Sequence, residues 1–351
     1  MRSTLSHPER EPIRVGLIFN IKRIKPSYGG ANDAEAEFDS PATIEALAEA
    51  IRSFGHEVVL MEATPELASS IRPGAVDVVF NVAEGIRGRS REAQVPALLE
   101  LCDIPYTGSD PATLLLAHDK GLAKRLVRQA GIPTPNWFVM RTLRDEIPSD
   151  LRYPVVVKPI AEGSSKGVQA KSVSENEFDL RAATTAIVER YPDGVIVEEF
   201  LPGREFTVGL LGENPVRILP PMEIIFRADL HNPIYTFDHK LDFNDEVRYD
   251  LPAKLDAKLL EEIERVARGA FEALGCRDVA RIDLRMDAKG VVNFIECNPL
   301  PGLAPKWSDL ARIAEQTGLD YPGLIGEILA PALRRFRAKQ AALRAANKGA
   351  A

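Results

Sequence analysis

Short β-rich runs alternate with helix-period segments over roughly the first third of this chain, and that alternation constrains the fold more than any other feature. The run RVGLIFN, residues 14–20, is typical of a buried parallel strand. Ser40-Pro41 predicts a helix N-cap followed by proline at the first helical position, and Gly55 predicts the end of that helix. Further β-rich runs occupy residues 57–61 and 77–81. The pattern predicts a small α/β unit with a parallel sheet.

A second region begins beyond a proline-rich break. The helix period resumes from Ala117 to Ala130, and the run Ile132-Pro133-Thr134-Pro135 cannot continue that helix, so it predicts a linker. The following segment predicts an α+β lobe with these elements: a strand at 155–158, a Gly/Ser loop at 163–167, a helix around 174–190 and a strand at 195–199.

The remainder of the chain predicts a third region, also α+β. A polar segment from Arg227 to Asp250 has little periodicity and is long enough to be a lid. A helix is expected from about Lys254 to Leu274, and the tail from residue 331 is typical of a solvated helix. Two closing strands, 279–286 and 292–297, are joined by Asp287-Ala288-Lys289-Gly290, which indicates a hairpin.

The length of 351 residues, 45% of them hydrophobic, exceeds what one ordinary core organises. We therefore expect three parts: an N-terminal α/β domain over residues 1–116, a central subdomain over 117–200, and a C-terminal subdomain over 201–351 that carries a metal site and a final helix.

Composition excludes several classes of function. The net charge is -7, without a basic face interleaved with aromatics, so nucleic acid is not an expected partner. The apolar runs are far shorter than the roughly 20 residues that span a bilayer, and the first residues lack an apolar signal core. We expect a cytoplasmic protein that does not enter a membrane. The three cysteines, Cys102, Cys276 and Cys297, are scattered and indicate neither a disulfide framework nor a zinc site.

The Gly/Ser loop has the composition of a phosphate-covering loop. Glycines at 163 and 167 let backbone N–H groups approach an anion, although neither of the two commonest nucleotide fingerprints is present. Lys158 ends the preceding apolar strand, which would place an ammonium beside the loop. The alternatives are an ordinary turn and a surface lysine that extends to solvent.

The two closing strands carry polar residues at alternating positions. Arg281 and Asp283 share one strand face, and Glu296 and Asn298 share a face of the other. If the hairpin pairs these strands, a guanidinium and three oxygen-bearing side chains converge. Two carboxylates and an amide are ligands that Mg²⁺ prefers, together with substrate phosphates. The alternative is a structural ion pair between Arg281 and one of the acids.

Three motifs occur in an order that identifies a family: VVVKPIAEGSSKGV, VIVEEFLPGREFTVGLL and ARIDLRMDAKGVVNFIECNPLPG. Together with the segment from Val79, they resemble the D-alanine:D-alanine ligase branch of the ATP-grasp family over roughly residues 79–302. The resemblance implies the ATP-grasp fold, ATP and two Mg²⁺ ions with Mn²⁺ as a substitute, small carboxylic acid and amine substrates, and a homodimer. It also implies formation of a peptide bond through an acyl phosphate and, for D-alanine, a place in peptidoglycan synthesis.

The resemblance also implies roles for individual residues. The ATP-binding residues would be Lys120 and Lys158 on the phosphates, Gly163, Ser164 and Ser165 in the covering loop, Glu198, Glu199, Phe200 and Leu201 along adenine, and Glu205 on the ribose. The metal ligands would be Asp283, Glu296 and Asn298. The catalytic residues would be Arg281, Ser164 and Lys240, and the substrate residues Glu37, Ser40, Arg281, Gly302 and Ser308.

The chain departs from the family pattern mainly around the amino-acid pockets. Leu241, Ala304 and Trp307 stand where hydroxyl residues are typical, and the spacing leaves open whether Glu35 or Glu37 is the N-terminal acid. Three hypotheses follow: a ligase of D-alanine or another amino-acid pair, an ATP-grasp ligase of secondary metabolism with a different acid donor, and a non-catalytic nucleotide-binding regulator.

A basic stretch adds a further choice. Arg87, Arg89 and Arg91 would either form a solvated loop or meet an acidic substrate, and the composition favours the solvated loop.

Overall fold

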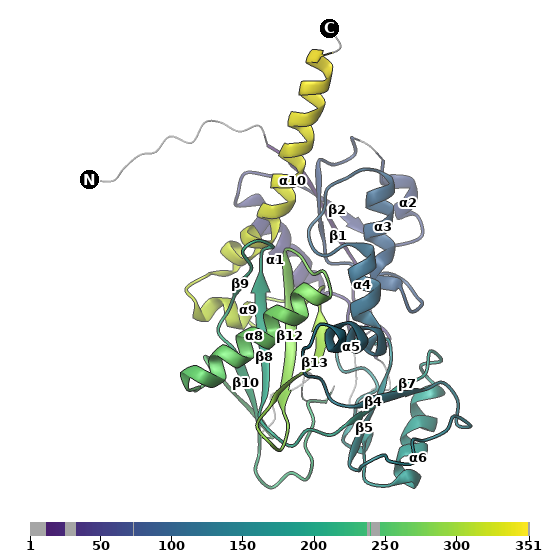
Figure 1. The fold of residues 1–351 in the computed structure, drawn as a ribbon. Coiled ribbons are helices and arrows are strands. Elements are labelled where there is room, and N and C mark those ends of the chain that lie inside the picture. The colour runs from purple at the N-terminus through teal and green to yellow at the C-terminus, as the bar shows by residue number, and fades with distance from the viewer. Residues whose placement is uncertain (1–11, 25–32, 73, 237–238, 240–245, 350–351) are drawn as a thin grey trace.

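The computed structural model describes residues 12–24, 33–72, 74–236, 239 and 246–349. Within these residues the strands form three sheets, and each sheet falls inside one of the three predicted parts of the chain (Figure 1). We retain the divisions 1–116, 117–200 and 201–351 as a proposal, with one adjustment. The helix Pro111–His118 (α4) crosses the first boundary, so a division before Pro111 would keep that helix whole.

The first sheet is parallel, as the sequence predicts. Its strands are β1 (Arg14–Phe19), β2 (Glu57–Glu62) and β3 (Val78–Asn81), in the order β2-β1-β3. The central strand β1 is buried on both faces, which explains its unbroken apolar run. Helix α1 (Pro41–Arg52) begins at the predicted N-cap, where Ser40 Oγ accepts a hydrogen bond of 3.1 Å from Thr43 N.

Helices cover both faces of this sheet. On one face Val15 and Leu17 pack against α1 and the N-terminal half of α10 (Tyr321–Gly349). On the other face Ile18 and Val79 pack against α2 (Leu67–Ser70) and α3 (Gln94–Leu101). The alternation of strand residues between the two cores follows from the two-residue period of a strand. The C-terminal half of α10 projects away from the body (Figure 1), as expected for a solvated tail.

The prediction of one continuous helix from Ala117 to Ala130 is wrong. The chain forms α4 and then α5 (Lys120–Gln129), which meet at Asp119. The Asp119 backbone is extended, and its carboxylate accepts a hydrogen bond of 2.8 Å from Leu122 N. An N-cap therefore interrupts an otherwise continuous helical pattern and sets Lys120 at the first position of α5.

The second sheet is antiparallel, in the order β4-β7-β5-β6. One face packs against α6 through Leu180, Ala183 and Ile187. The predicted linker is anchored to the third sheet, because Phe294 N donates to Pro133 O and Thr134 Oγ1 donates to Phe294 O, both at 2.8 Å. The elements of this part are β4 (Trp137–Met140), β5 (Val155–Pro159), β6 (Val173–Ser174), α6 (Glu177–Val188) and β7 (Val195–Glu199), with a 3-10 turn at Ala170–Ser172.

The third sheet is antiparallel in the order β11-β10-β8-β12-β13, with β9 paired to β8. Its core-facing side packs against α5 and α8. The polar segment predicted as a lid ends in a strand, β11, paired to β10, so its last residues are not loop. The elements are β8 (Glu205–Leu211), β9 (Arg217–Ile218), β10 (Met222–Phe226), β11 (Val247–Asp250), α8 (Ala257–Ala273), β12 (Val279–Met286), β13 (Val292–Asn298) and α9 (Asp309–Gln316).

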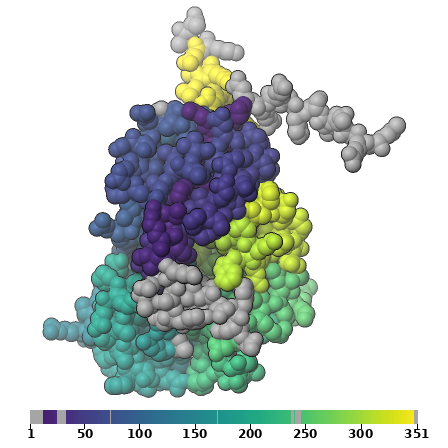
Figure 2. Space-filling model, turned by 180° about the vertical axis from the view of Figure 1, so that it is seen from behind, coloured from purple at the N-terminus to yellow at the C-terminus, as the bar shows by residue number. Residues whose placement is uncertain are grey.

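The three parts meet around a common centre. Figure 2 shows the N-terminal part, purple to blue, above the teal central part and the green C-terminal part. Among the described residues, no helix combines the length and the apolar character that crossing a membrane requires.

Candidate active site

The hairpin of β12 and β13 brings together the polar residues that the sequence places there. Arg281 pairs in register with Asn298, and Asp283 pairs with Glu296. The residues between them, Ile282 among them, point into the core. The predicted convergence on one sheet face is therefore confirmed.

Asp283 lies at the centre of this group. Its carboxylate accepts hydrogen bonds from Arg281 Nε at 3.1 Å, Asn298 Nδ2 at 3.1 Å and Thr207 Oγ1 at 2.6 Å. The ion pair between Arg281 and Asp283 that was the alternative interpretation is also present. Burial opposes the charge of Arg281, but Asp283 and Asp309 outweigh it and raise the pKa of the guanidinium, so Arg281 is a permanent cation.

The same side chains have the chemistry of a magnesium site. Among the described residues, no three His, Cys, Asp or Glu side chains gather into a metal-binding group. Asp283, Glu296 and Asn298 offer two carboxylates and an amide, which fits Mg²⁺ because this ion takes only one or two carboxylates and completes its shell with phosphate oxygens and water. The donor set fits the ion but does not enclose it.

Opposite the hairpin lies a pair of buried lysines around one carboxylate. Lys158 Nζ is 2.9 Å from Glu198 Oε2, and Lys124 Nζ is 3.5 Å from Glu198 Oε1. Burial opposes ionisation of Glu198, but the two lysines outweigh it and lower its pKa. Burial also lowers the pKa of Lys124 to about 8. Lys158 is 8% exposed, so the alternative of a lysine extended to solvent is wrong.

Lys120 connects the lysine side to the hairpin. Its Nζ donates to Glu162 O at 2.5 Å and lies 3.5 Å from Glu296 Oε2. The family resemblance assigns Lys120 to the site but does not include Lys124. The signal was available, because residues four apart share a helix face and Lys124 falls among apolar positions of α5.

A narrow cavity of about 90 Å³ runs between the lysines and the hairpin. Its apolar lining includes Val156, Ile224 and Ile295, which suits a flat aromatic ring. Glu205 lies in the lining and pairs with Arg285 at 2.9 Å. Of the residues predicted to bind ATP, those lining the cavity are Lys120, Lys158, Ser165, Glu198, Glu199, Phe200, Leu201 and Glu205.

The Gly/Ser loop adopts an unusual backbone. Ser164 and Ser165 have φ of 49° and 58°, in the left-handed region that costs non-glycine residues energy, and Gly167 has φ of 71°. A Cβ on Gly167 would lie 2.7 Å from the Tyr191 ring, so this position requires glycine. Lys166 N donates to Gly163 O at 2.9 Å and Val168 N donates to Ser165 O at 3.0 Å, so the loop contains ordinary turns, and its role in covering phosphates stays a prediction.

Glu37 ties this loop to the N-terminal part. Its carboxylate accepts a hydrogen bond of 2.8 Å from Gly163 N and pairs with Arg91 at 2.9 Å and Lys166 at 3.3 Å. Burial opposes ionisation, but Arg91 and Lys166 outweigh it and lower the pKa of Glu37 to about 2. Glu35 instead accepts from the backbone of Arg23, so Glu37 is the acid that reaches the pocket.

The solvated-loop prediction for the basic stretch is wrong for Arg91 and only partly right for Arg89, whose side chain is 40% exposed. Arg91 is 7% exposed and pairs with Glu37 and with Glu162, which lies 3.0 Å away. Arg89 pairs with the buried Asp119 at 2.6 Å. Arg87 is exposed. The local sequence pattern could not reveal the pairing of Arg91, because Glu37 and Glu162 lie far from it in the sequence.

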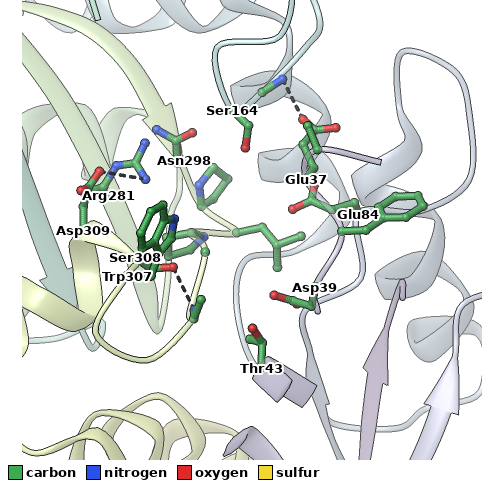
Figure 3. Close-up of a pocket in the computed structure, with 18 of the residues that line it drawn as sticks. Glu37, Asp39, Thr43, Glu84, Ser164, Arg281, Asn298, Trp307, Ser308 and Asp309 are labelled. Atoms are coloured by element: carbon green, nitrogen blue, oxygen red, sulfur yellow. Dashed lines mark hydrogen bonds and ion pairs between the residues drawn. The ribbon is translucent and has the colours of Figure 1, made fainter. Parts of the chain in front are cut away.

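A second, wider cavity of about 670 Å³ opens beside the first. The predicted substrate residues Glu37, Ser40, Arg281, Gly302 and Ser308 line it, together with Ser164. Figure 3 shows Glu37, Asp39, Thr43 and Glu84 on one side, and Arg281, Asn298, Trp307 and Asp309 on the other. The fold therefore gathers the proposed substrate residues around one space.

Several residues of this cavity were not predicted. Asp39 and Glu84 line its N-terminal wall, and Asp309 and Arg312 line the opposite one. Asp309 opens α9, 3.9 Å from the Arg281 guanidinium, and Ser308 Oγ accepts from Ala304 N at 2.9 Å to close the turn before that helix.

The departures from the family pattern also fall on this cavity. Ala304 and Trp307 both line it, and Trp307 is 48% exposed. The predicted catalytic Lys240 and the neighbouring Leu241 lie outside the described residues. His239 lines the cavity and stacks on Tyr235, with ring centroids 6.1 Å apart. An indole in place of a small hydroxyl residue changes the shape and polarity of the pocket.

Comparison with known proteins places this site in a family. A family model described as the D-ala D-ala ligase C-terminus matches residues 126–330. The D-alanine–D-alanine ligase of Aquifex aeolicus is 33% identical over 302 residues, covering 86% of this chain and 97% of that protein. An uncharacterized protein of Sinorhizobium fredii, y4sG, is 38% identical over 296 residues, covering 82% and 86%.

Solved structures share the fold. The D-alanine–D-alanine ligase of Bacillus anthracis complexed with ATP superposes with a TM-score of 0.73 at 21% identity, covering 94% of this chain and all of that one. The VanG D-Ala:D-Ser ligase of Enterococcus faecalis gives 0.72 at 22% identity, covering 92% and 100%. Sequence and fold agree, and the chain belongs to the D-alanine–D-alanine ligase branch of the ATP-grasp family, whose members are ATP-dependent ligases.

Proposed function

We propose that this protein joins two amino acids, or another carboxylic acid and an amine, through an acyl phosphate, with release of ADP and phosphate. One observation carries the proposal: the polar group of Arg281, Asp283, Glu296 and Asn298 lies between the lysine-lined cavity and the wide cavity. A phosphoryl group bound at this junction would be within reach of a carboxylate in the wide cavity.

The chemistry proceeds in two displacements. A carboxylate oxygen of the first substrate attacks the γ-phosphorus, and the bond from phosphorus to the bridging oxygen breaks, so ADP leaves with the electron pair. The amine then attacks the acyl carbon and loses a proton, and phosphate leaves. Phosphoryl transfer depends chiefly on positioning and charge neutralisation.

Residues of this chain supply those two requirements. Lys120 and Lys158 would neutralise phosphate oxygens, and Arg281 would hold the transferred group and then the oxyanion of the tetrahedral intermediate. Asp283, Glu296 and Asn298 would hold two Mg²⁺ ions, with Mn²⁺ as a substitute, and such ions withdraw charge from the phosphoryl oxygens. The loop at 163–167 would exclude water from the acyl phosphate.

The identity of the substrates is a separate question. Two of the proteins named above are D-alanine–D-alanine ligases and one is a D-Ala:D-Ser ligase, but Trp307 and Ala304 line the wide cavity where the resemblance implies hydroxyl residues. These changes favour a relative with altered amino-acid pockets over the standard D-alanine ligase. An acid donor other than an amino acid is the second candidate for the same reason.

The test is a screen of paired acids and amines, with D-alanine included, for magnesium-dependent release of ADP and phosphate. We expect one phosphate per amide product, and mass spectrometry identifies the product. Absence of ADP release with every pair would overturn the proposed activity. ADP release from D-alanine alone, with a dipeptide of matching mass, would instead assign the standard substrate.

A further inference from the structure

The wide cavity has an acidic N-terminal wall. Four carboxylic residues of the N-terminal part line it: Glu37, Asp39, Glu84 and Glu92. The wall faces the Arg281 and Asn298 side of the cavity (Figure 3), so a substrate held against it would extend toward the centre of phosphoryl transfer. The charges on this wall therefore bear on which substrates the cavity accepts.

Two of the four acids are already compensated. Glu37 is bound by Arg91, Lys166 and the amide of Gly163, as described above. Glu92 Oε1 lies 2.5 Å from His118 Nδ1. These two carboxylates have partners within the protein and need none from a ligand.

The other two acids have no such partner. Among the described residues, neither the Glu84 nor the Asp39 side chain takes part in a hydrogen bond or ion pair, and Figure 3 shows both carboxylates directed at the cavity. Lys22 also lines the cavity, but its Nζ donates to Ala36 O at 3.0 Å, and its charge lowers the pKa of Asp39 by less than burial raises it.

An unpaired carboxylate that is half-buried in a cavity wall is unfavourable, because it loses part of its water without gaining a counter-charge. Burial accordingly raises the pKa of Asp39 to about 7, and burial together with Glu37 and Glu92 raises that of Glu84 well above its usual range. A bound cation would remove this cost. Without a ligand the raised pKa values favour the protonated acids, and a bound cation would let both ionise. Two carboxylates on one wall call for more positive charge than the single α-ammonium of alanine provides.

The size of the cavity agrees with a larger substrate. Its volume of about 670 Å³ falls in the range of roughly 300–1,000 Å³ that accommodates drug-sized ligands.

We propose that Glu84 and Asp39 select an amino-acid substrate whose side chain carries a positive charge, of the lysine or ornithine class. This substrate would bind in the wide cavity, which the two acids line, and would react there. The inference rests on the proposed function for the reaction, but the binding preference can be measured without turnover.

The test compares lysine with norleucine, which lacks the side-chain ammonium, as both D and L forms. Calorimetry on the full chain with Mg²⁺ and a non-hydrolysable ATP analogue gives the two dissociation constants. We expect lysine to bind at least about 30-fold more tightly than norleucine, in line with a desolvated charge contact. The double variant Glu84→Gln with Asp39→Asn should reduce this ratio to below about threefold, whereas Glu45→Gln, on the exposed side of α1, should leave it unchanged.

The outcomes separate the two proposals. Equal affinity for lysine and norleucine in the unaltered protein overturns the inference, even when neutral amino acids release ADP. A lysine preference that survives the double variant also overturns it. A lysine preference that the double variant abolishes supports the inference. If the unaltered protein shows that preference but releases no ADP with any amine, the proposed ligase activity is wrong and the binding preference stands.

Discussion

The two cavities of this site differ in how their charges are balanced. In the narrow cavity Glu198 is shared by Lys124 and Lys158, and Glu205 pairs with Arg285. In the wide cavity Glu84 and Asp39 face the open space without a partner among the described residues. The charges of the first cavity are balanced within the chain, whereas on our proposal a ligand would balance those of the second. The comparison teaches that the wide cavity is the place to look for what sets the choice of substrate.

The largest expected effect concerns the junction between the cavities. Glu296→Gln removes a hard anionic ligand and the partner of Lys120, and we expect kcat to fall about 100- to 1,000-fold with the fold intact. Magnesium-dependent ADP release measures it, and Glu45→Gln is the control. Unchanged turnover would remove Glu296 from the metal site.

The second prediction tests the buried ion pairs of Arg91 beside the wide cavity. Arg91→Met leaves Glu37 and Glu162 without their guanidinium, and breaking a buried pair costs roughly 3–5 kcal/mol of unfolding free energy. Arg87→Met, on the exposed part of the same loop, should change stability by less than about 0.5 kcal/mol. Denaturant unfolding decides between them, and equal effects would mean that Arg91 is as solvated as Arg87.

The third prediction concerns Lys158 in the narrow cavity. Lys158→Ala should raise the dissociation constant of ATP about 10- to 100-fold, because a charge-assisted contact with phosphate is lost. Lys171→Ala, at an exposed position of the same part, should leave ATP affinity within about twofold. Isothermal titration provides both values, and an ATP affinity unaffected by Lys158→Ala would count against its assigned role.

The smallest expected effect is the pH dependence of folding stability that the unpaired Asp39 causes. Asp39 has its pKa raised from 3.8 to about 7, so its carboxyl holds a proton more tightly in the folded than in the unfolded state. Folding stability should therefore decline as pH rises from about 4 to 7. The full shift corresponds to roughly 4 kcal/mol, and partial access to solvent through the cavity should reduce it to about 1–2 kcal/mol.

Asp39→Asn should abolish this contribution, making the variant more stable than the parent at pH 8 but not at pH 4. Chemical unfolding at both pH values is the measurement. An identical pH dependence in the two proteins would show that Lys22 or solvent already compensates Asp39.

Much of this architecture could be predicted from the sequence. The parallel N-terminal unit, the N-cap at Ser40 and the hairpin that aligns Asp283 with Glu296 all follow from local patterns of period two or 3.6. Of the residues that the family resemblance assigns to ATP, eight line the narrow cavity, whereas Gly163 and Ser164 line the wide one. Local sequence patterns and the order of motifs are enough to predict the parts of the site whose residues lie close together in the sequence.

The rest depends on partners far apart in the chain. Asp39 and Glu84 are 45 positions apart and reach one wall only because β1 and β3 are adjacent in the sheet. Arg91 looks like a solvated arginine until the fold brings Glu37 and Glu162 to it. The division into α4 and α5 was missed because one capping aspartate, Asp119, interrupts a continuous periodicity.

The attachment of the linker to β13 limits how the central part can move. Pro133 and Thr134 are bonded to Phe294, two residues before Glu296, and Lys124 donates to Thr134 at 3.1 Å. A rocking motion of the central sheet would pivot about this point. Atoms beside the pivot would travel least, so Lys124 would keep its distance from the hairpin while α6, farther out in Figure 1, would sweep the larger arc. On the proposed function, such a motion would alter access to the site more than the contacts beside Lys124.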